Sequence, residues 1–338
     1  MGWVLHASPR AEAESQYPTI IAICVVLSII SIAGVGSRLW IRYTGRGLEK
    51  DDWMAALSAG FALTYAILCI AQTRYGLGLP ISSRPAKSLV IYTRVNYAGR
   101  PVYQVGVSFF KLALLISYLR LLQGTNHKTY RRIVYFAILT VFVSHLACAF
   151  CLIFACDPVQ KSWEPLMKGG RCLAPGPSFT AYAFVTIVSD IVVAALPVPM
   201  LLALNIPTEK KIGLVGIFAL GLFTTLCSVF RYLQINRIQF GDGNSTMLIL
   251  WGVIEFNVGN LVSSLPFLAP IFIKKTRGYR SKQSSGNGSS GSWMKWGKGS
   301  RWESKGAYKL SDRRQNQCAF GSADDSSLNE LGCRKVIH

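Results

Sequence analysis

The chain has 338 residues, of which 51% are hydrophobic and only 15% charged, yet its formal net charge is +20. A basic excess of this size would suggest a nucleic-acid-binding protein if the chain were soluble, but a mean hydropathy of +0.34 is typical of a chain dissolved in lipid. The basic residues lie in the C-terminal region and beside the apolar stretches, so we expect a bilayer, and no nucleic acid, as the partner.

Seven apolar stretches are long enough to cross a bilayer, whose hydrocarbon core of about 30 Å requires about 20 helical residues. In chain order they run roughly over 19–41, 53–73, 101–122, 133–155, 178–204, 212–234 and 247–273. Each is apolar on all sides, unlike an amphipathic surface helix. The sequence therefore predicts an all-α membrane protein, a seven-transmembrane-helix bundle.

The flanking charges predict how this bundle lies in the membrane. More Lys and Arg fall on the inner segments if the N-terminus is outside. We therefore expect a short extracellular N-terminus over 1–18, a membrane domain over 19–275 and a cytoplasmic tail over 276–338. The tail is basic and begins with a Ser- and Gly-rich stretch that cannot bury a core, so it should be disordered.

Two features of the loops mark the predicted outer side. Cys156 and Cys172 both fall between the fourth and fifth stretches, where an oxidising compartment would let them form a disulfide worth about 3 kcal/mol. Asn244-Ser245-Thr246 is a possible N-glycosylation site between the sixth and seventh stretches, although it lies close to the membrane.

Ionisable residues interrupt four of the stretches, at a cost of at least about 2.5 kcal/mol each on insertion scales. Lys111 and Asp190 lie at similar depth and have opposite signs, as do Arg231 and Glu255 nearer the outer side. They predict two interior ion pairs or one shared network. Further candidates for its hydrogen bonds are Trp251, Asn257, Asn260 and His145. The network is interpreted either as a ligand or proton site or as a structural lock.

The order of motifs along the chain resembles a known family. The matching residues are Arg42, Asp51-Asp52-Trp53, Lys111, Tyr118-Leu119-Arg120, Cys156-Asp157-Pro158, Gly170-Arg171-Cys172, Asp190, Leu196-Pro197-Val198-Pro199, Arg231, Trp251, Glu255 and Pro270. In this order they resemble the fungal rhodopsin-like seven-helix membrane proteins, which include relatives of the satratoxin-cluster membrane protein and fungal GPCR-like proteins.

The resemblance does not extend to retinal chemistry. A retinal Schiff base needs a lysine deep in the last stretch, and none lies between Met247 and Ile273. We expect neither a cofactor nor a metal. No catalytic motif of the H-E-x-x-H, G-x-S-x-G or phosphate-loop type occurs, so the sequence leans away from an enzyme without excluding one.

Three functions remain open at this point. The resemblance implies a receptor-like protein, most simply in the plasma membrane, that binds a small molecule among its helices. Tyr118 and Arg120 would then lie where the bundle couples to a cytoplasmic signalling partner. The alternatives are a membrane enzyme or carrier of a secondary-metabolite pathway, and a scaffold.

Overall fold

A computed structural model describes most of the chain. The described residues are 2–45, 47–79, 83–121, 128–164, 166–198, 208–240 and 244–285, with side chains left out at 86, 121, 175, 208–217, 236–240 and 266–285. The chain divides into two compact units, Met1–Gly286 and Asn287–His338. The second unit lies outside the described residues, and with it most of the predicted tail.

The first unit is built from helices, and seven of them are long and apolar enough to cross a membrane. The long helices are α2 (Tyr17–Gly45), α3 (Lys50–Thr73), α4 (Leu89–Leu121), α5 (Lys128–Ile153), α6 (Pro175–Ala195), α8 (Thr208–Phe240) and α9 (Thr246–Ser285). The short elements are α1 (Pro9–Ala13), η2 (Ala86–Ser88), β1 (Cys156–Asp157), η3 (Val159–Ser162) and β2 (Arg171–Cys172). The predicted seven-helix fold is confirmed. Which end of the bundle faces outside stays a prediction.

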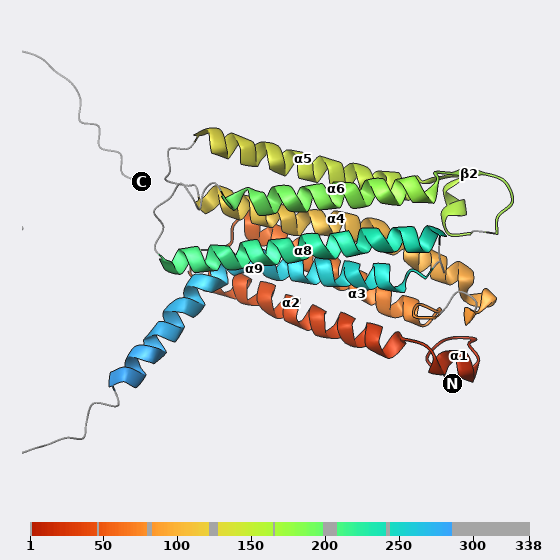
Figure 1. The fold of residues 1–338 in the computed structure, drawn as a ribbon, viewed down its shortest axis with the longest axis horizontal. Coiled ribbons are helices and arrows are strands. Elements are labelled where there is room, and N and C mark those ends of the chain that lie inside the picture. The colour runs from red at the N-terminus through yellow and green to blue at the C-terminus, as the bar shows by residue number, and fades with distance from the viewer. Residues whose placement is uncertain are drawn as a thin grey trace, which may run out of the picture. The chain divides into compact units, whose positions relative to one another are not determined.

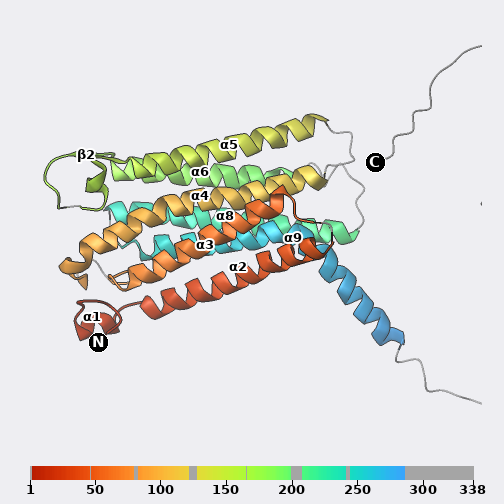
Figure 2. The same ribbon diagram turned by 180° about the vertical axis from the view of Figure 1, so that it is seen from behind.

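The long helices lie side by side in one bundle (Figure 1), and two of them are far more buried than the others. In the most apolar window of α4, 78% of the residues are buried, and in that of α9, 67%, against 22–33% in the other helices. The remaining helices pack around them, with α3 and α5 along α4 and α2 and α8 along α9 (Figure 2). Their outward side chains are apolar and exposed, as lipid-facing surfaces must be, because lipid provides no hydrogen-bond partners.

The central helix α4 begins at Leu89, twelve residues before the predicted start at 101. The predicted stretch begins after Arg100, at Pro101, because a charge and a proline both lower the hydropathy of a window that extends further toward the N-terminus. The structure accommodates both, since Arg100 lies over the ring of Phe179 and α4 continues through Pro101. The added turns bring the start of α4 beside the loop that carries η3, where Arg94 pairs with Glu164.

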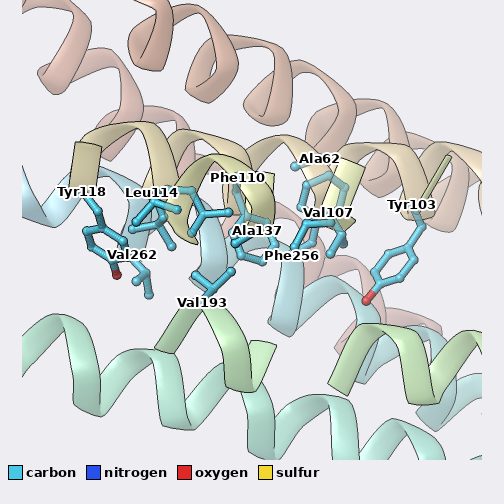
Figure 3. Close-up of a cluster of buried hydrophobic side chains, with 13 residues drawn as sticks. Ala62, Tyr103, Val107, Phe110, Leu114, Tyr118, Ala137, Val193, Phe256 and Val262 are labelled. Carbon is cyan, nitrogen blue, oxygen red and sulfur yellow. The ribbon is translucent and has the colours of Figure 1, made fainter. Parts of the chain in front are cut away.

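A continuous apolar core lies around α4 (Figure 3). Its buried members on α4 include Val107, Phe110 and Tyr118, and α3, α5, α6 and α9 contribute the rest. Two glycines let α4 and α9 approach closely. A Cβ on Gly106 would lie 2.3 Å from the Phe256 ring, and one on Gly259 would lie 2.6 Å from the Phe110 ring. Each helix therefore inserts a phenylalanine against a glycine of the other.

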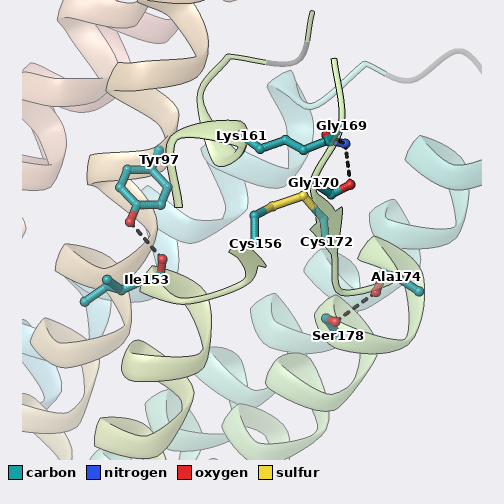
Figure 4. The surroundings of a disulfide bond; sticks show 9 residues. All are labelled: Tyr97, Ile153, Cys156, Lys161, Gly169, Gly170, Cys172, Ala174 and Ser178. Atoms are coloured by element: carbon teal, nitrogen blue, oxygen red, sulfur yellow. Dashed lines mark hydrogen bonds between the residues drawn. A yellow bond between two sulfur atoms is a disulfide. The ribbon is translucent and has the colours of Figure 1, made fainter. Parts of the chain in front are cut away.

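The predicted outer end carries the disulfide (Figure 4). Cys156 and Cys172 are bonded, as predicted, and they pair β1 with β2 in an antiparallel two-stranded sheet. The Tyr97 hydroxyl of α4 donates to the Ile153 carbonyl at the end of α5 at 2.9 Å. The Thr93 hydroxyl of α4 donates to the Trp163 carbonyl at 2.6 Å and ties this loop to the bundle. The N-terminal segment is folded onto the same end, because the Trp3 indole donates to Thr73 at 3.0 Å.

Candidate ligand site

The Lys111–Asp190 ion pair occupies the middle of the bundle. Lys111 Nζ lies 2.9 Å from Asp190 Oδ1, and both side chains are almost fully buried. The ammonium also donates to Ser189 Oγ at 2.7 Å and to the Thr186 carbonyl at 3.2 Å. Asp190 accepts a further hydrogen bond from Ser228 at 2.7 Å. These contacts offset the cost of burying two charges, because each is paired and hydrogen-bonded.

A chain of hydrogen bonds extends from this pair toward the disulfide end. His145 Nε2 lies 3.1 Å from Ser189 Oγ, and its Nδ1 lies 3.1 Å from Gln104 Nε2. Ser189 therefore joins Lys111 to His145, which joins Gln104 on the next turns of α4. All of these side chains are buried. Such a chain polarises along its length, so a change at one member alters the hydrogen bonds of the others.

The Arg231–Glu255 pair is held more loosely. Arg231 Nε lies 3.3 Å from Glu255 Oε2, and the guanidinium lies 4.6 Å from the centre of the Tyr103 ring. Both Glu255 oxygens, and Arg231 Nε and Nη2, are buried without a hydrogen-bond partner among the described residues. This pair thus has Coulomb attraction but unused hydrogen-bonding capacity, which a bound molecule or water could take up.

A cavity of about 520 Å³ adjoins both networks. Its lining comes from α3, α4, α5, α6, α8 and the start of α9, and it includes Gln104, Arg231, Tyr65, Tyr103 and Arg100. Apolar and aromatic side chains make up most of the rest. A pocket of this volume with a few polar groups is the usual form of a small-molecule site. In the part of the chain that the structure describes, no group of His, Cys, Asp or Glu is arranged to hold a metal.

Three predicted network residues lie elsewhere. Trp251 stacks on Phe230 at 4.9 Å between ring centres, so its large aromatic surface packs between α8 and α9. Asn257 donates to the Val253 carbonyl of its own helix at 2.9 Å. Asn260 accepts from Ser58 of α3. None of the three reaches an ion pair through the described contacts, because matching depth along a span does not specify which way a side chain faces.

A second charged region, at the opposite end of the bundle, was not predicted. We call it the arginine–aspartate cluster; its members are Arg38, Arg42, Glu49, Asp51, Asp52 and Arg120. Arg38 is fully buried and lies 2.7 Å from Asp51 and 2.8 Å from Asp52. It also donates to the Ser263 carbonyl of α9. The cluster therefore ties α2, α3, α4 and α9 together.

The predicted coupling residues fall at this end, and only one is partly accessible. Tyr118 is 2% exposed and belongs to the apolar core, so its side chain is not a contact surface. The Arg120 side chain is 20% exposed and lies 2.8 Å from Glu49. At the other end, Asn244 Oδ1 accepts from the Thr246 hydroxyl at 2.7 Å, and its glycosylation stays a prediction.

The chain is similar to several fungal membrane and gene-cluster proteins. The SAT4 family membrane protein of Emericella nidulans is 25% identical over 70% of this chain and 58% of its own length. Satratoxin biosynthesis SC1 cluster protein 4 of Stachybotrys chartarum is 26% identical over 62% of this chain and 74% of its own. Receptor GIN3 of Arthrobotrys oligospora is 23% identical over 78% of this chain and 65% of its own.

The chain thus matches less than two thirds of the length of the first of these relatives. No solved structure matches it. The fungal rhodopsin domain matches residues 37–274, which include all four interior charges and both cysteines of the disulfide. With seven apolar helices in the same region, this chain belongs to the fungal rhodopsin domain family of multi-pass membrane proteins.

Proposed function

We propose that the protein is a receptor-like membrane protein that binds a small molecule in the cavity and signals at the opposite end. The observation that supports this most is the position of α4. It lines the cavity with Tyr103 and Gln104, holds Lys111 at mid-bundle and ends at the arginine–aspartate cluster with Arg120. One rigid, buried element thus joins a binding pocket to a charged surface, as coupling between two sites requires.

The relay would begin at Gln104. A ligand that takes a hydrogen bond from this amide competes with His145, which lies 3.1 Å from it. The loss would pass through Ser189 to Lys111 and change how the ammonium divides its bonds between Ser189 and Asp190. Two packings of α4 against α6 would then differ in free energy by the worth of a few hydrogen bonds. A ligand can shift the populations of two states that differ by so little.

The readout would be the pair between Arg120 and Glu49. Their side chains are 20% and 46% exposed, so this is the part of the arginine–aspartate cluster that a partner can reach. On the predicted topology it faces the cytoplasm. A small displacement of α4 would open or close this pair and so alter the surface offered to a signalling protein.

The names of the relatives support two different functions, a receptor and a protein of a biosynthetic pathway. The name Receptor GIN3 supports sensing, whereas two others are named for polyenoic acids and fugralins biosynthesis clusters. Those names favour the second candidate, a membrane enzyme or carrier of a secondary-metabolite pathway, with the same cavity as its substrate site. A receptor of this kind would reside in the plasma membrane, which imaging of a tagged chain would test.

The decisive experiment breaks the relay at its cavity end. In the native host, Gln104→Leu keeps the side-chain volume and removes the amide that faces His145. The matched control is Ser108→Ala, one turn further along α4, since among the described residues its hydroxyl bonds only to the Val105 carbonyl of its own helix. We expect both variants to reach wild-type abundance in the membrane. Only Gln104→Leu should reproduce the transcriptional response of the deletion strain.

The two candidates then separate by metabolite profile. A receptor deletion changes transcription first, and any change in metabolites follows from it. A deletion in which a single pathway intermediate accumulates while transcription is unchanged would contradict the receptor proposal and support the enzyme or carrier. Wild-type behaviour of Gln104→Leu would contradict the relay.

A further inference from the structure

The residues described around the cavity carry an uncompensated positive charge. Of the residues described around it, two are arginines, Arg100 and Arg231, and none is Asp or Glu. Arg231 is paired with Glu255, which lies behind the cavity wall. Arg100 has no carboxylate within ion-pair distance among the described residues, and its described contact is with the ring of Phe179, 4.9 Å from Cζ. The net charge offered to a ligand is therefore that of one guanidinium.

This arrangement contrasts with four other arginines on the helices. Arg38, Arg42, Arg94 and Arg120 all face carboxylates. A guanidinium that lines a mostly apolar cavity loses part of its hydration, and among the described residues no anion replaces it. Since a guanidinium offers a planar fork of donors that matches a carboxylate, a ligand carboxylate is the group that best restores this loss.

The remaining lining defines the body of the ligand. Tyr65, Tyr103, Phe179 and Tyr182 present aromatic surface to the cavity, with aliphatic side chains between them. A volume of about 520 Å³ accommodates a molecule of drug size. Gln104 provides one further polar contact on the wall, at the start of the relay proposed above.

We infer that the cavity binds a small organic monoanion, a carboxylate with an apolar or aromatic body, whose charge pairs with Arg100. This inference names the class of ligand for the receptor proposed above. The effect of the ligand on signalling rests on that proposal, whereas its binding to the cavity does not. A cation is disfavoured because both arginines would repel it. A dianion is disfavoured because Glu255 already neutralises Arg231.

The test uses purified full-length protein in nanodiscs and matched probes that differ only in charge. Three acids serve as probes, 4-phenylbutyric, decanoic and indole-3-propionic acid, each with its primary alcohol and primary amine. We expect at least one acid to bind about ten- to a hundredfold more tightly than its alcohol, the range for a charge-assisted hydrogen bond, and its amine to bind more weakly still. Dissociation constants come from thermophoresis, corrected with empty nanodiscs.

Three variants locate the interaction. Arg100→Gln should reduce the preference for the acid to the level of the alcohol, and Arg100→Lys should keep most of it. Arg94→Gln is the control, six residues away on α4, with its side chain 56% exposed and paired with Glu164. It should bind as the wild type does. Size-exclusion profiles check that each variant is folded. If Arg100→Gln does not fold, the comparison of acid with alcohol on the wild type still decides whether the cavity prefers an anion.

Several results would overturn the inference: equal affinity for acid and alcohol, an acid preference that survives in Arg100→Gln, or no saturable binding by any of the acids. The proposed signalling role fails separately. If Arg100→Gln loses acid binding while Gln104→Leu cells respond normally, the ligand class stands and the relay does not.

Discussion

The arginine–aspartate cluster and the two interior ion pairs are each electrically balanced, but they are built differently. In the arginine–aspartate cluster, one buried guanidinium bonds two carboxylates and a backbone carbonyl, at 2.7 Å and 2.8 Å to the carboxylates. At mid-bundle and beside the cavity, charges form single pairs, and that of Arg231 with Glu255 leaves buried polar atoms without hydrogen bonds.

The difference indicates different roles. A guanidinium such as that of Arg38, which donates from all three of its nitrogens, resists movement, because any displacement leaves a buried group unsatisfied. A pair with spare donors and acceptors beside a cavity can exchange partners at little cost. We therefore interpret the buried contacts of Arg38 as the lock that holds α2, α3 and α9, and the interior pairs, with the exposed Arg120–Glu49 pair, as the part of the bundle that responds.

Removal of the lock should have the largest effect on stability. Arg38→Ala leaves Asp51 and Asp52 buried without their main cation, and we expect a loss of about 3–5 kcal/mol. The measurement is the yield and thermal unfolding of the protein in detergent. The exposed control Arg94→Ala should change stability by less than about 1 kcal/mol. A stable Arg38→Ala protein would show that the cluster is not a lock.

The disulfide, which lies at the cavity end of the bundle, should make the next largest contribution to the free energy of unfolding. Replacing Cys156 and Cys172 together by Ser frees a loop with a sequence separation of 16, and the expected loss is about 3 kcal/mol. Reductant should lower the unfolding temperature of the wild type and leave the double variant unchanged. Cys151→Ser, at an exposed free thiol, is the control. Equal sensitivity to reductant in both proteins would refute this prediction.

The contact between α4 and α9 joins the two regions and should be next in size. In Gly259→Ala the new Cβ would lie 2.6 Å from the Phe110 ring, so the helices must separate, at a cost of about 1–3 kcal/mol. Gly60→Ala is the control, because it makes the same substitution at a position where nothing lies within 4 Å of the new Cβ. It should be neutral or slightly stabilising. Thermal unfolding of the two variants side by side decides the point.

Removal of both partners at mid-bundle should change stability least. Lys111→Met combined with Asp190→Leu replaces a buried pair by apolar side chains, which is often neutral or stabilising. We expect unfolding within about 1 kcal/mol of the wild type, together with loss of the cellular response. Each single variant should be much less stable than the double. A double variant as unstable as the singles would instead favour the lock interpretation for this pair.

The depth of a charged residue along its span was the sequence feature that best predicted the interior ion pairs. Lys111 and Asp190 were matched by depth and sign, and the structure brings them within 2.9 Å; the same holds for Arg231 and Glu255 at 3.3 Å. The method fails for Trp251, because depth does not give the direction in which a side chain faces. It also fails for Arg38, since a charge near the end of a span is read as a topology signal and not as a buried group.

The sequence by itself determined the seven helices, the family, the disulfide and the candidate interior charges. These follow from hydropathy over about 20 residues, from local motifs and from the cost of charge in lipid, all of which are properties of the chain alone. Only the tertiary structure decided that α4 and α9 are central, that Arg38 binds two aspartates, and that Arg100 lines a cavity whose described residues include no Asp or Glu. Those facts depend on the rotation of each helix about its axis, which is set by packing against its neighbours.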